Sequence, residues 1–216
     1  MGRTDVVRHI ESEGIVAVIR IAAADKLRAV IDALAEGGVR ALEVTMTVPR
    51  ALDLISEIAG ALPKGFLVGA GTVLDTETAR LAILSGAQFV VSPVLRRPVV
   101  EMCHRYDVAA LPGCFTPTEI LEAWEAGADI VKVFPATALG PGFFKDVRGP
   151  LPQVKLMPTG GVSLDNAGDW IAAGAVAVGV GTALLDAKAI ACGDYAVLTA
   201  NARRICASVR KAREER

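Results

Sequence analysis

The sequence predicts an α/β fold, a (β/α)8 barrel with one extra N-terminal helix, and two observations carry this prediction. A helix end, a glycine stop and an apolar strand recur in that order at intervals of roughly 20 to 25 residues. The instances are AEGGVRALEVT (35–45), LSGAQFVVSP (84–93), EAGADIVKVFP (125–135) and AAGAVAVGVG (172–181). The apolar runs also show little polar alternation, which is typical of parallel strands covered on both faces.

The predicted elements alternate along the chain. A helix over residues 4–13 precedes the first strand, and helical patterns such as 26–37 and 117–127 separate later strands. Thr116 with Glu119 has the spacing of a capping box at the start of one of them. Eight strands are predicted, at 15–20, 41–45, 66–70, 88–92, 108–111, 130–134, 154–158 and 176–180. Short connections between alternating strands and helices favour parallel βαβ units, and eight such units predict a closed barrel.

Composition limits the class of protein. The 216 residues are 52% hydrophobic, and no linker rich in proline or serine interrupts them, so residues 1–216 are predicted to form one domain. A net charge of −1 gives no electrostatic footprint for nucleic acid or for an anionic membrane surface. No apolar run approaches the roughly 20 residues of a membrane span. The sequence therefore predicts neither a nucleic-acid nor a membrane partner.

Cysteine and histidine usage gives two further expectations. The four cysteines form no CxxC pair, and the N-terminal MGRTDVVRHIESEG has acidic residues where a signal peptide has an apolar stretch. We therefore expect reduced thiols in a cytoplasmic protein. Neither His9 nor His104 belongs to an HExxH or HxH pattern, so no metal site is predicted.

Lys132 is the residue that most needs an explanation, because it interrupts the apolar strand in DIVKVFPAT (129–137). A buried ammonium is rare unless it is paired or used. One interpretation is a structural ion pair with Glu43, which lies in the second strand. The other is a nucleophilic lysine whose pKa is lowered by apolar neighbours, at about 1.4 kcal/mol for each pKa unit. A neutral amine attacks a ketone to form a Schiff base, and the iminium withdraws electrons from the adjacent carbon–carbon bond. Lys155 also falls in a predicted strand, but at its start, away from the expected site.

Other polar residues follow the predicted strands at their C-terminal ends, where barrels of this class hold their active sites. They are Arg20, Thr45, Thr72, Ser92 with Pro93, the TGG of 159–161 and the GVGT of 179–182. Glycine loops after the last two strands expose backbone N–H groups, and the segment SLDNAGDW after TGG starts a helix, so the loops suit a phosphate group. The alternative is that these glycines only form tight turns.

Seven segments together carry a resemblance to a known family. EVTMT, VGAGTVLD, FVVSP, PGCFTPTE, VKVFPA, PTGGVSLDN and VGVGTAL, in this order, resemble the class I 2-keto-3-deoxy-6-phosphogluconate (KDPG) aldolases, also described as 4-hydroxy-2-oxoglutarate (KHG) aldolases. The resemblance implies a (β/α)8 barrel, usually a homotrimer, that needs no cofactor. It implies cleavage of KDPG to pyruvate and glyceraldehyde 3-phosphate, and of KHG to pyruvate and glyoxylate.

The resemblance also implies roles for individual residues. Lys132 matches the Schiff-base lysine, and Glu43 matches the carboxylate that shuttles protons. The residues expected to bind the phosphorylated 2-keto acid are Arg20, Thr45, Thr72, Pro93, Phe134 and Thr159. Those expected to bind its phosphate are Gly160, Gly161, Gly181 and Thr182.

One position departs from the best-studied branch, which has an arginine two residues after the strand-two threonine. This chain has Thr47 there, and Arg20 at the end of the first strand is the candidate replacement. Some members of the family, including galactonate-specific relatives, have a similar arginine. The preferred C4 stereoisomer therefore stays open.

Two other functions remain as alternatives. One is a different phosphate-binding barrel enzyme, such as a sugar-phosphate epimerase, which needs no nucleophilic lysine. The other is a non-catalytic barrel used for binding or assembly, since a mean hydropathy of +0.44 indicates more apolar surface than a monomer needs. That alternative gives no reason for Lys132, Glu43 and Arg20 to share one face.

Overall fold

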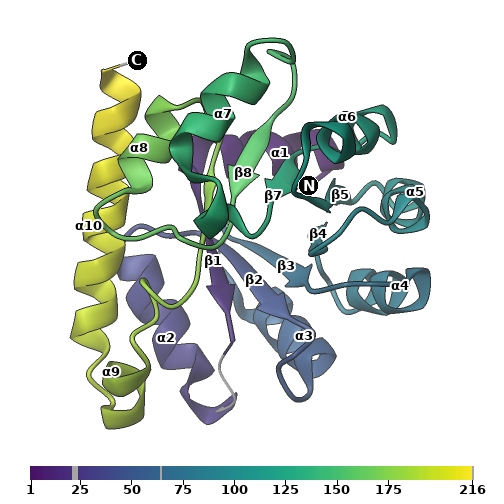
Figure 1. Ribbon diagram of the computed structural model, residues 1–216. Coiled ribbons are helices and arrows are strands. Elements are labelled where there is room, and N and C mark those ends of the chain that lie inside the picture. Colours follow the sequence, from purple (N-terminus) through teal and green to yellow (C-terminus); the bar gives the residue numbers. More distant parts are fainter. Residues whose placement is uncertain (21–23, 64, 216) are drawn as a thin grey trace.

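The computed structural model describes residues 1–20, 24–63 and 65–215, and Figure 1 shows a central group of parallel strands surrounded by helices. The strands are β1 (Ile15–Ile19), β2 (Ala41–Thr45), β3 (Leu67–Gly71), β4 (Phe89–Val91), β5 (Ala109–Leu111), β6 (Gly113–Cys114), β7 (Val131–Val133), β8 (Leu156–Pro158) and β9 (Val178–Val180). They form a six-stranded sheet in the order β5-β4-β3-β2-β1-β9 and a three-stranded sheet in the order β6-β7-β8. Every strand pair is parallel, as βαβ units require.

Helices follow the strands in the predicted alternation. They are α1 (Arg3–Glu13), α2 (Ala24–Glu36), α3 (Ala51–Ala61), α4 (Thr76–Leu84), α5 (Arg97–Arg105), α6 (Pro117–Glu125), α7 (Gly140–Arg148), α8 (Ala167–Ala172), α9 (Ala187–Cys192) and α10 (Tyr195–Glu214). The capping box is confirmed: the Thr116 hydroxyl accepts from the Glu119 N–H, and the Glu119 carboxylate accepts from the Thr116 N–H.

The predicted fifth strand, 108–111, corresponds to β5, and the additional short strand β6 continues the same extended segment. Pro112 has no N–H, and it separates β5 from β6. β5 pairs with β4, whereas β6 pairs with β7, so one extended segment borders both sheets. The Asp129 N–H donates to the Ala110 carbonyl (3.0 Å), and at the other junction the Val176 N–H donates to the Leu156 carbonyl (2.9 Å). Hydrogen bonds therefore connect the two sheets at both of their edges.

Among the remaining predicted strands, 41–45 has the bounds of β2, and the others are present with shorter or shifted bounds. Arg20 lies just beyond β1 and is exposed, and Lys155 precedes β8 instead of lying within it. Pairing ends where the chains diverge into loops, which apolar periodicity alone does not reveal.

Two apolar clusters lie on opposite sides of the strands. The inner cluster joins strand residues such as Ala41 and Ile130 to side chains of α1, and α1 lies behind the strands in the view of Figure 1. The outer cluster, which includes Leu42 and Val131, packs between the strands and the surrounding helices. Because side chains alternate along a strand, each residue's position in the sequence decides which cluster it faces.

Candidate active site

Lys132 and Glu43 lie on the inner face of the strands. Each is two residues beyond a member of the inner cluster, Ile130 in one case and Ala41 in the other, and so points to the same side. Lys132 is 3% exposed and Glu43 is 1% exposed. Strand β7 is hydrogen-bonded to β6 on one side and to β8 on the other, and Lys132 pairs in register with Gly113 and Met157.

Within the part of the chain that the structure describes, neither charged group has the partner that a structural ion pair requires. Both carboxylate oxygens of Glu43 are buried without a hydrogen bond to any residue that the structure describes. The Lys132 ammonium lies 5.0 Å from the centroid of the Phe134 ring, a cation–π contact from its own strand end. Burying charges without partners is costly, so this arrangement contributes no obvious stability.

Burial shifts both groups toward their neutral forms. It lowers the pKa of Lys132, and the positive charge of Arg20 adds to this effect, while the negative charge of Glu43 opposes it. Burial likewise raises the pKa of Glu43, against the opposing effects of Lys132 and Arg20. The three charges that the sequence places at strand ends are thus close enough to influence one another, and the two buried groups titrate as a pair.

The predicted substrate-binding threonines differ in what they contact. Thr45 is fully buried, and its hydroxyl is already engaged by the Thr47 hydroxyl (2.7 Å) and the Ile19 carbonyl (3.4 Å). Thr159 is 5% exposed, and its buried hydroxyl has no partner among the described residues. Thr72 has a φ of 61°, which is rare for a β-branched residue because its side chain crowds the backbone. Such strain is more common at functional sites than elsewhere.

The predicted phosphate loops hold backbone amides near the same strand ends. Gly160 and Gly161 have φ values of 88° and 74°, which glycine adopts without strain. Outside the helices and strands, no backbone hydrogen bond among the described residues uses the N–H of Gly161, Gly181 or Thr182. The helix expected in SLDNAGDW is α8, which has only six residues.

Two remaining predictions concern Pro93 and Lys155. Pro93 follows β4 half-buried, and its backbone lies against Gly113, where an added Cβ would approach the Pro93 carbonyl to 2.3 Å. Lys155 forms an ion pair with Glu11 of α1 (2.8 Å) and its side chain is 37% exposed. That pairing occupies Lys155 at the opposite end of the strands from the predicted site.

Sequence reasoning missed two glycines that border the site. An ideal Cβ at Gly71 would lie 1.9 Å from Oε1 of Glu43, and one at Gly179 would lie 2.4 Å from the Thr159 hydroxyl oxygen. Both occur in glycine-containing strand ends, GAGT and GVGT, but the sequence alone does not tell which side chain lies opposite.

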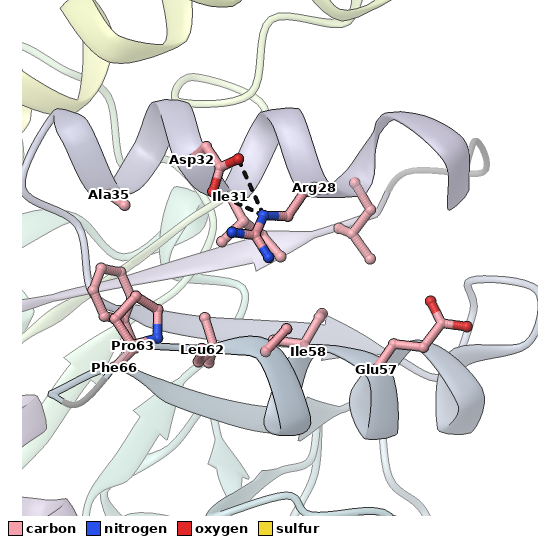
Figure 2. Close-up of a pocket in the computed structure, with 11 residues that line it drawn as sticks. Arg28, Ile31, Asp32, Ala35, Glu57, Ile58, Leu62, Pro63 and Phe66 are labelled. Carbon is pink, nitrogen blue, oxygen red and sulfur yellow. Dashed lines mark hydrogen bonds and ion pairs between the residues drawn. The ribbon is translucent and has the colours of Figure 1, made fainter.

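A pocket of about 230 Å³ elsewhere on the surface does not contain these residues. Figure 2 shows it between α2 and α3, lined by apolar side chains such as Ile31, Ile58 and Phe66 with the Arg28–Asp32 ion pair at its edge. Among the described residues, no cluster of three or more His, Cys, Asp or Glu side chains could hold a metal ion. No helix within the described ranges is long and apolar enough to cross a membrane.

Comparison with known proteins gives consistent matches over most of the chain. The family model described as "Aldolase: KDPG and KHG aldolase" matches residues 6–201. The 2-dehydro-3-deoxy-phosphogluconate aldolase of Treponema pallidum is 39% identical, over 78% of this chain and 80% of the relative. The 2-dehydro-3-deoxy-6-phosphogalactonate aldolase of Escherichia coli K12 is 33% identical, over 79% of this chain and 83% of the relative.

A solved structure adds a chemical observation about a similar protein. The KDPG aldolase from Legionella pneumophila, with pyruvate captured as a covalent carbinolamine intermediate, superposes with a TM-score of 0.85 at 27% identity. The match covers 92% of this chain and 97% of that one.

Proposed function

The chain belongs to the KDPG and KHG aldolase family, and from this premise we propose that it cleaves KDPG to pyruvate and glyceraldehyde 3-phosphate, and KHG to pyruvate and glyoxylate. The observation that carries the proposal is the pair of buried, unpaired groups on one inner face, Lys132 and Glu43. Burial lowers the pKa of Lys132, which favours the neutral amine that a nucleophile needs. Burial raises the pKa of Glu43, which makes its carboxylate a stronger base that can take up a proton and return it. The chemistry uses protein side chains alone and calls for no metal or other cofactor.

In the proposed mechanism, Arg20 and Thr72 bind the carboxylate of the 2-keto acid. The neutral amine of Lys132 attacks the C2 ketone, and loss of water gives an iminium. Glu43 removes the proton of the C4 hydroxyl, the C3–C4 bond breaks, and its electrons pass into the iminium to give an enamine. The aldehyde leaves, C3 of the enamine is protonated, and water releases pyruvate from Lys132.

Further residues surround this chemistry in the proposal. Thr45, Pro93, Phe134 and Thr159 line the substrate, and Thr159 offers the one hydroxyl of this set that is buried without a partner in the described structure. The amides of Gly160, Gly161, Gly181 and Thr182 bind the phosphate. Support for that role is the set of unengaged loop N–H groups, which suit an anion.

The C4 stereochemistry has a second candidate. Relatives named for the phosphogluconate and for the phosphogalactonate both match this chain, at 39% and 33% identity. Thr47 stands where the best-studied branch has its arginine, which leaves Arg20 to bind the carboxylate. We favour the gluconate configuration, because the relative named for the phosphogluconate has the higher sequence identity to this chain. Pyruvate release from the two C4 epimers, measured side by side, tests this choice.

Borohydride trapping tests the lysine. The protein is incubated with pyruvate and sodium borohydride, digested, and analysed by mass spectrometry for the reduced pyruvyl adduct. We expect the adduct on Lys132, and we expect Lys132→Ala to abolish both the adduct and turnover. Lys155→Ala is the matched control and keeps both. An adduct on Lys155, or none at all, would favour the alternative of another phosphate-binding barrel enzyme.

We also propose a finer architecture for the chain: one domain, with the two sheets closed into a single eight-stranded barrel in which β5 and β6 form one strand. The hydrogen bonds at both sheet junctions support closure. The packing of α10 against both α2 and α8 supports a single domain, because it joins the end of the chain to its first half.

A cytoplasmic homotrimer completes the proposal. Large apolar side chains are exposed on and next to α4, α5 and α6, which are neighbours in Figure 1, and an oligomer interface would cover them. They include Leu74, Leu81, Leu84, Val94 and Leu121. Light scattering measures the molar mass of the assembly, and Leu84→Glu is expected to reduce it. A monomeric mass for the unaltered chain would refute the trimer.

A further inference from the structure

Gly71, the last residue of β3, faces the carboxylate of Glu43. An ideal Cβ at this position would lie 1.9 Å from Oε1, 2.6 Å from Cδ and 2.7 Å from Cγ of Glu43. In the register of β2 and β3, Glu43 pairs with Gly69 and Thr45 pairs with Gly71. The Glu43 side chain therefore extends past its own pairing partner, Gly69, toward the C-terminal ends of the strands. Its carboxylate occupies the space that a side chain at position 71 would take.

The backbone does not require glycine at this position. Gly71 is not among the glycines with positive φ, so an alanine could adopt its conformation without strain. Its neighbour Gly69 differs, because a Cβ there would lie 2.4 Å from the Phe89 ring, which belongs to the inner apolar cluster. At Gly71 the conflict is with the end of a flexible acidic side chain. What Gly71 provides is space for that side chain.

Space matters here because no hydrogen bond within the described part of the chain holds the carboxylate. Neither oxygen of Glu43 has a hydrogen-bond partner among the described residues. A carboxylate fixed by N–H donors would resist displacement, whereas this one is held by the shape of the surrounding wall and by the charges of Lys132 and Arg20, which act without a hydrogen bond. A single methyl group at position 71 would move it, and no donor would draw it back.

We propose that Gly71 is a positioning residue, whose missing side chain lets the Glu43 carboxylate lie where it exchanges protons with the substrate bound to Lys132. This inference rests on the proposed function and adds a determinant of its proton-transfer step. Gly71→Ala thus displaces the carboxylate while leaving the lysine and the rest of the strand in place.

The test follows the hydrogens of pyruvate, since exchange of its methyl hydrogens with deuterium requires the enamine. The wild type, Gly71→Ala, Glu43→Gln and the double variant are compared by NMR, with borohydride trapping on Lys132 as a parallel readout. Positioned acid–base catalysis contributes on the order of 10²-fold or more, so we expect Gly71→Ala to slow exchange by about that factor and still form the adduct. Gly60→Ala, in α3 with no atom within 4 Å of the added Cβ, is the control and exchanges like the wild type.

The double variant separates positioning from general damage. If Gly71 acts through Glu43, adding Gly71→Ala to Glu43→Gln slows exchange no further, whereas independent effects would multiply and overturn the inference. If Gly71→Ala exchanges the pyruvate hydrogens at the wild-type rate while Glu43→Gln is slow, the positioning role of Gly71 is refuted but the proton shuttle by Glu43 is not. Wild-type exchange in Glu43→Gln would refute the proposed proton shuttle and this inference with it.

A stability measurement tests the same contact without catalysis. If the added methyl group conflicts only with Glu43, then Gly71→Ala lowers the melting temperature less in a Glu43→Ala background than in the wild type. An equal loss in both backgrounds would mean that the methyl group meets some other part of the fold, and would overturn the inference.

Discussion

Replacing Lys132 by methionine is expected to abolish imine formation and, at the same time, to stabilise the fold. The substitution keeps an unbranched side chain in a place that is 3% exposed and removes an ammonium group with no carboxylate partner in the described structure. What is lost is the contact with the Phe134 ring, worth about 0.5–2 kcal/mol. What is gained is relief from burying a charge, at about 1.4 kcal/mol for each unit by which burial lowers the lysine pKa.

The expected outcome is a net gain in stability, and each 1 kcal/mol gained raises the melting temperature by about 2–4 °C for a chain of this length. Its pH dependence has a definite sign. Because the pKa of Lys132 is lowered in the folded state, its destabilising effect is absent well above the ordinary value of 10.5, grows as the pH falls from there to the folded-state pKa, and is constant at lower pH. The advantage of methionine is therefore complete below the folded-state pKa and is lost as the pH rises past 10.5.

Urea unfolding at several pH values measures this difference. The series is run in a Glu43→Gln background, because removing Lys132 would otherwise raise the pKa of Glu43 further. Lys155→Met is the matched control, since it breaks a half-exposed ion pair with Glu11 and should cost at most about 1 kcal/mol. A loss of about 3–5 kcal/mol for Lys132→Met in the wild-type background would instead identify a structural ion pair and refute the reasoning.

Three further predictions concern neighbouring groups. Arg20→Met should raise the pKa of Lys132, because the arginine charge lowers it, and should move the pH profile of borohydride trapping upward; an unchanged profile would contradict the coupling. Thr72→Gly should relieve the strain of a φ of 61° and leave stability equal or higher by about 1 kcal/mol, while the KM for the 2-keto acid rises; an unchanged KM would exclude Thr72 from the site. In iodoacetamide labelling at pH 8, exposed Cys192 should react first and Cys114 should stay unmodified, because burial raises the pKa of the Cys114 thiol to about 12; early labelling of Cys114 would be the contrary result.

The sequence predicted the order and type of the elements well, because periodicity and glycine stops are local properties. Apolar runs marked each strand, and the Thr116–Glu119 spacing identified a helix start that the hydrogen bonds confirm. The short strand β6, which continues the extended segment of β5 beyond Pro112, was not predicted, although the missing N–H of Pro112 was visible in the sequence. Which neighbour each half pairs with depends on residues far away along the chain, and local patterns carry no such information.

For the site, the sequence by itself determined which charged residues stand in buried strands and, through two-residue alternation, which residues of the same strand share their face. Lys132 and Glu43 follow from the apolar runs around them, and the inner cluster then shows that both lie on one face. Only the tertiary structure decided that Glu43 has no hydrogen-bond partner, that Lys155 is taken by Glu11, and that Gly71 leaves room for a carboxylate on the neighbouring strand. The reason is physical: alternation is fixed within one strand, whereas a contact across strands depends on register, side-chain direction and packing, which exist only once the chain has folded.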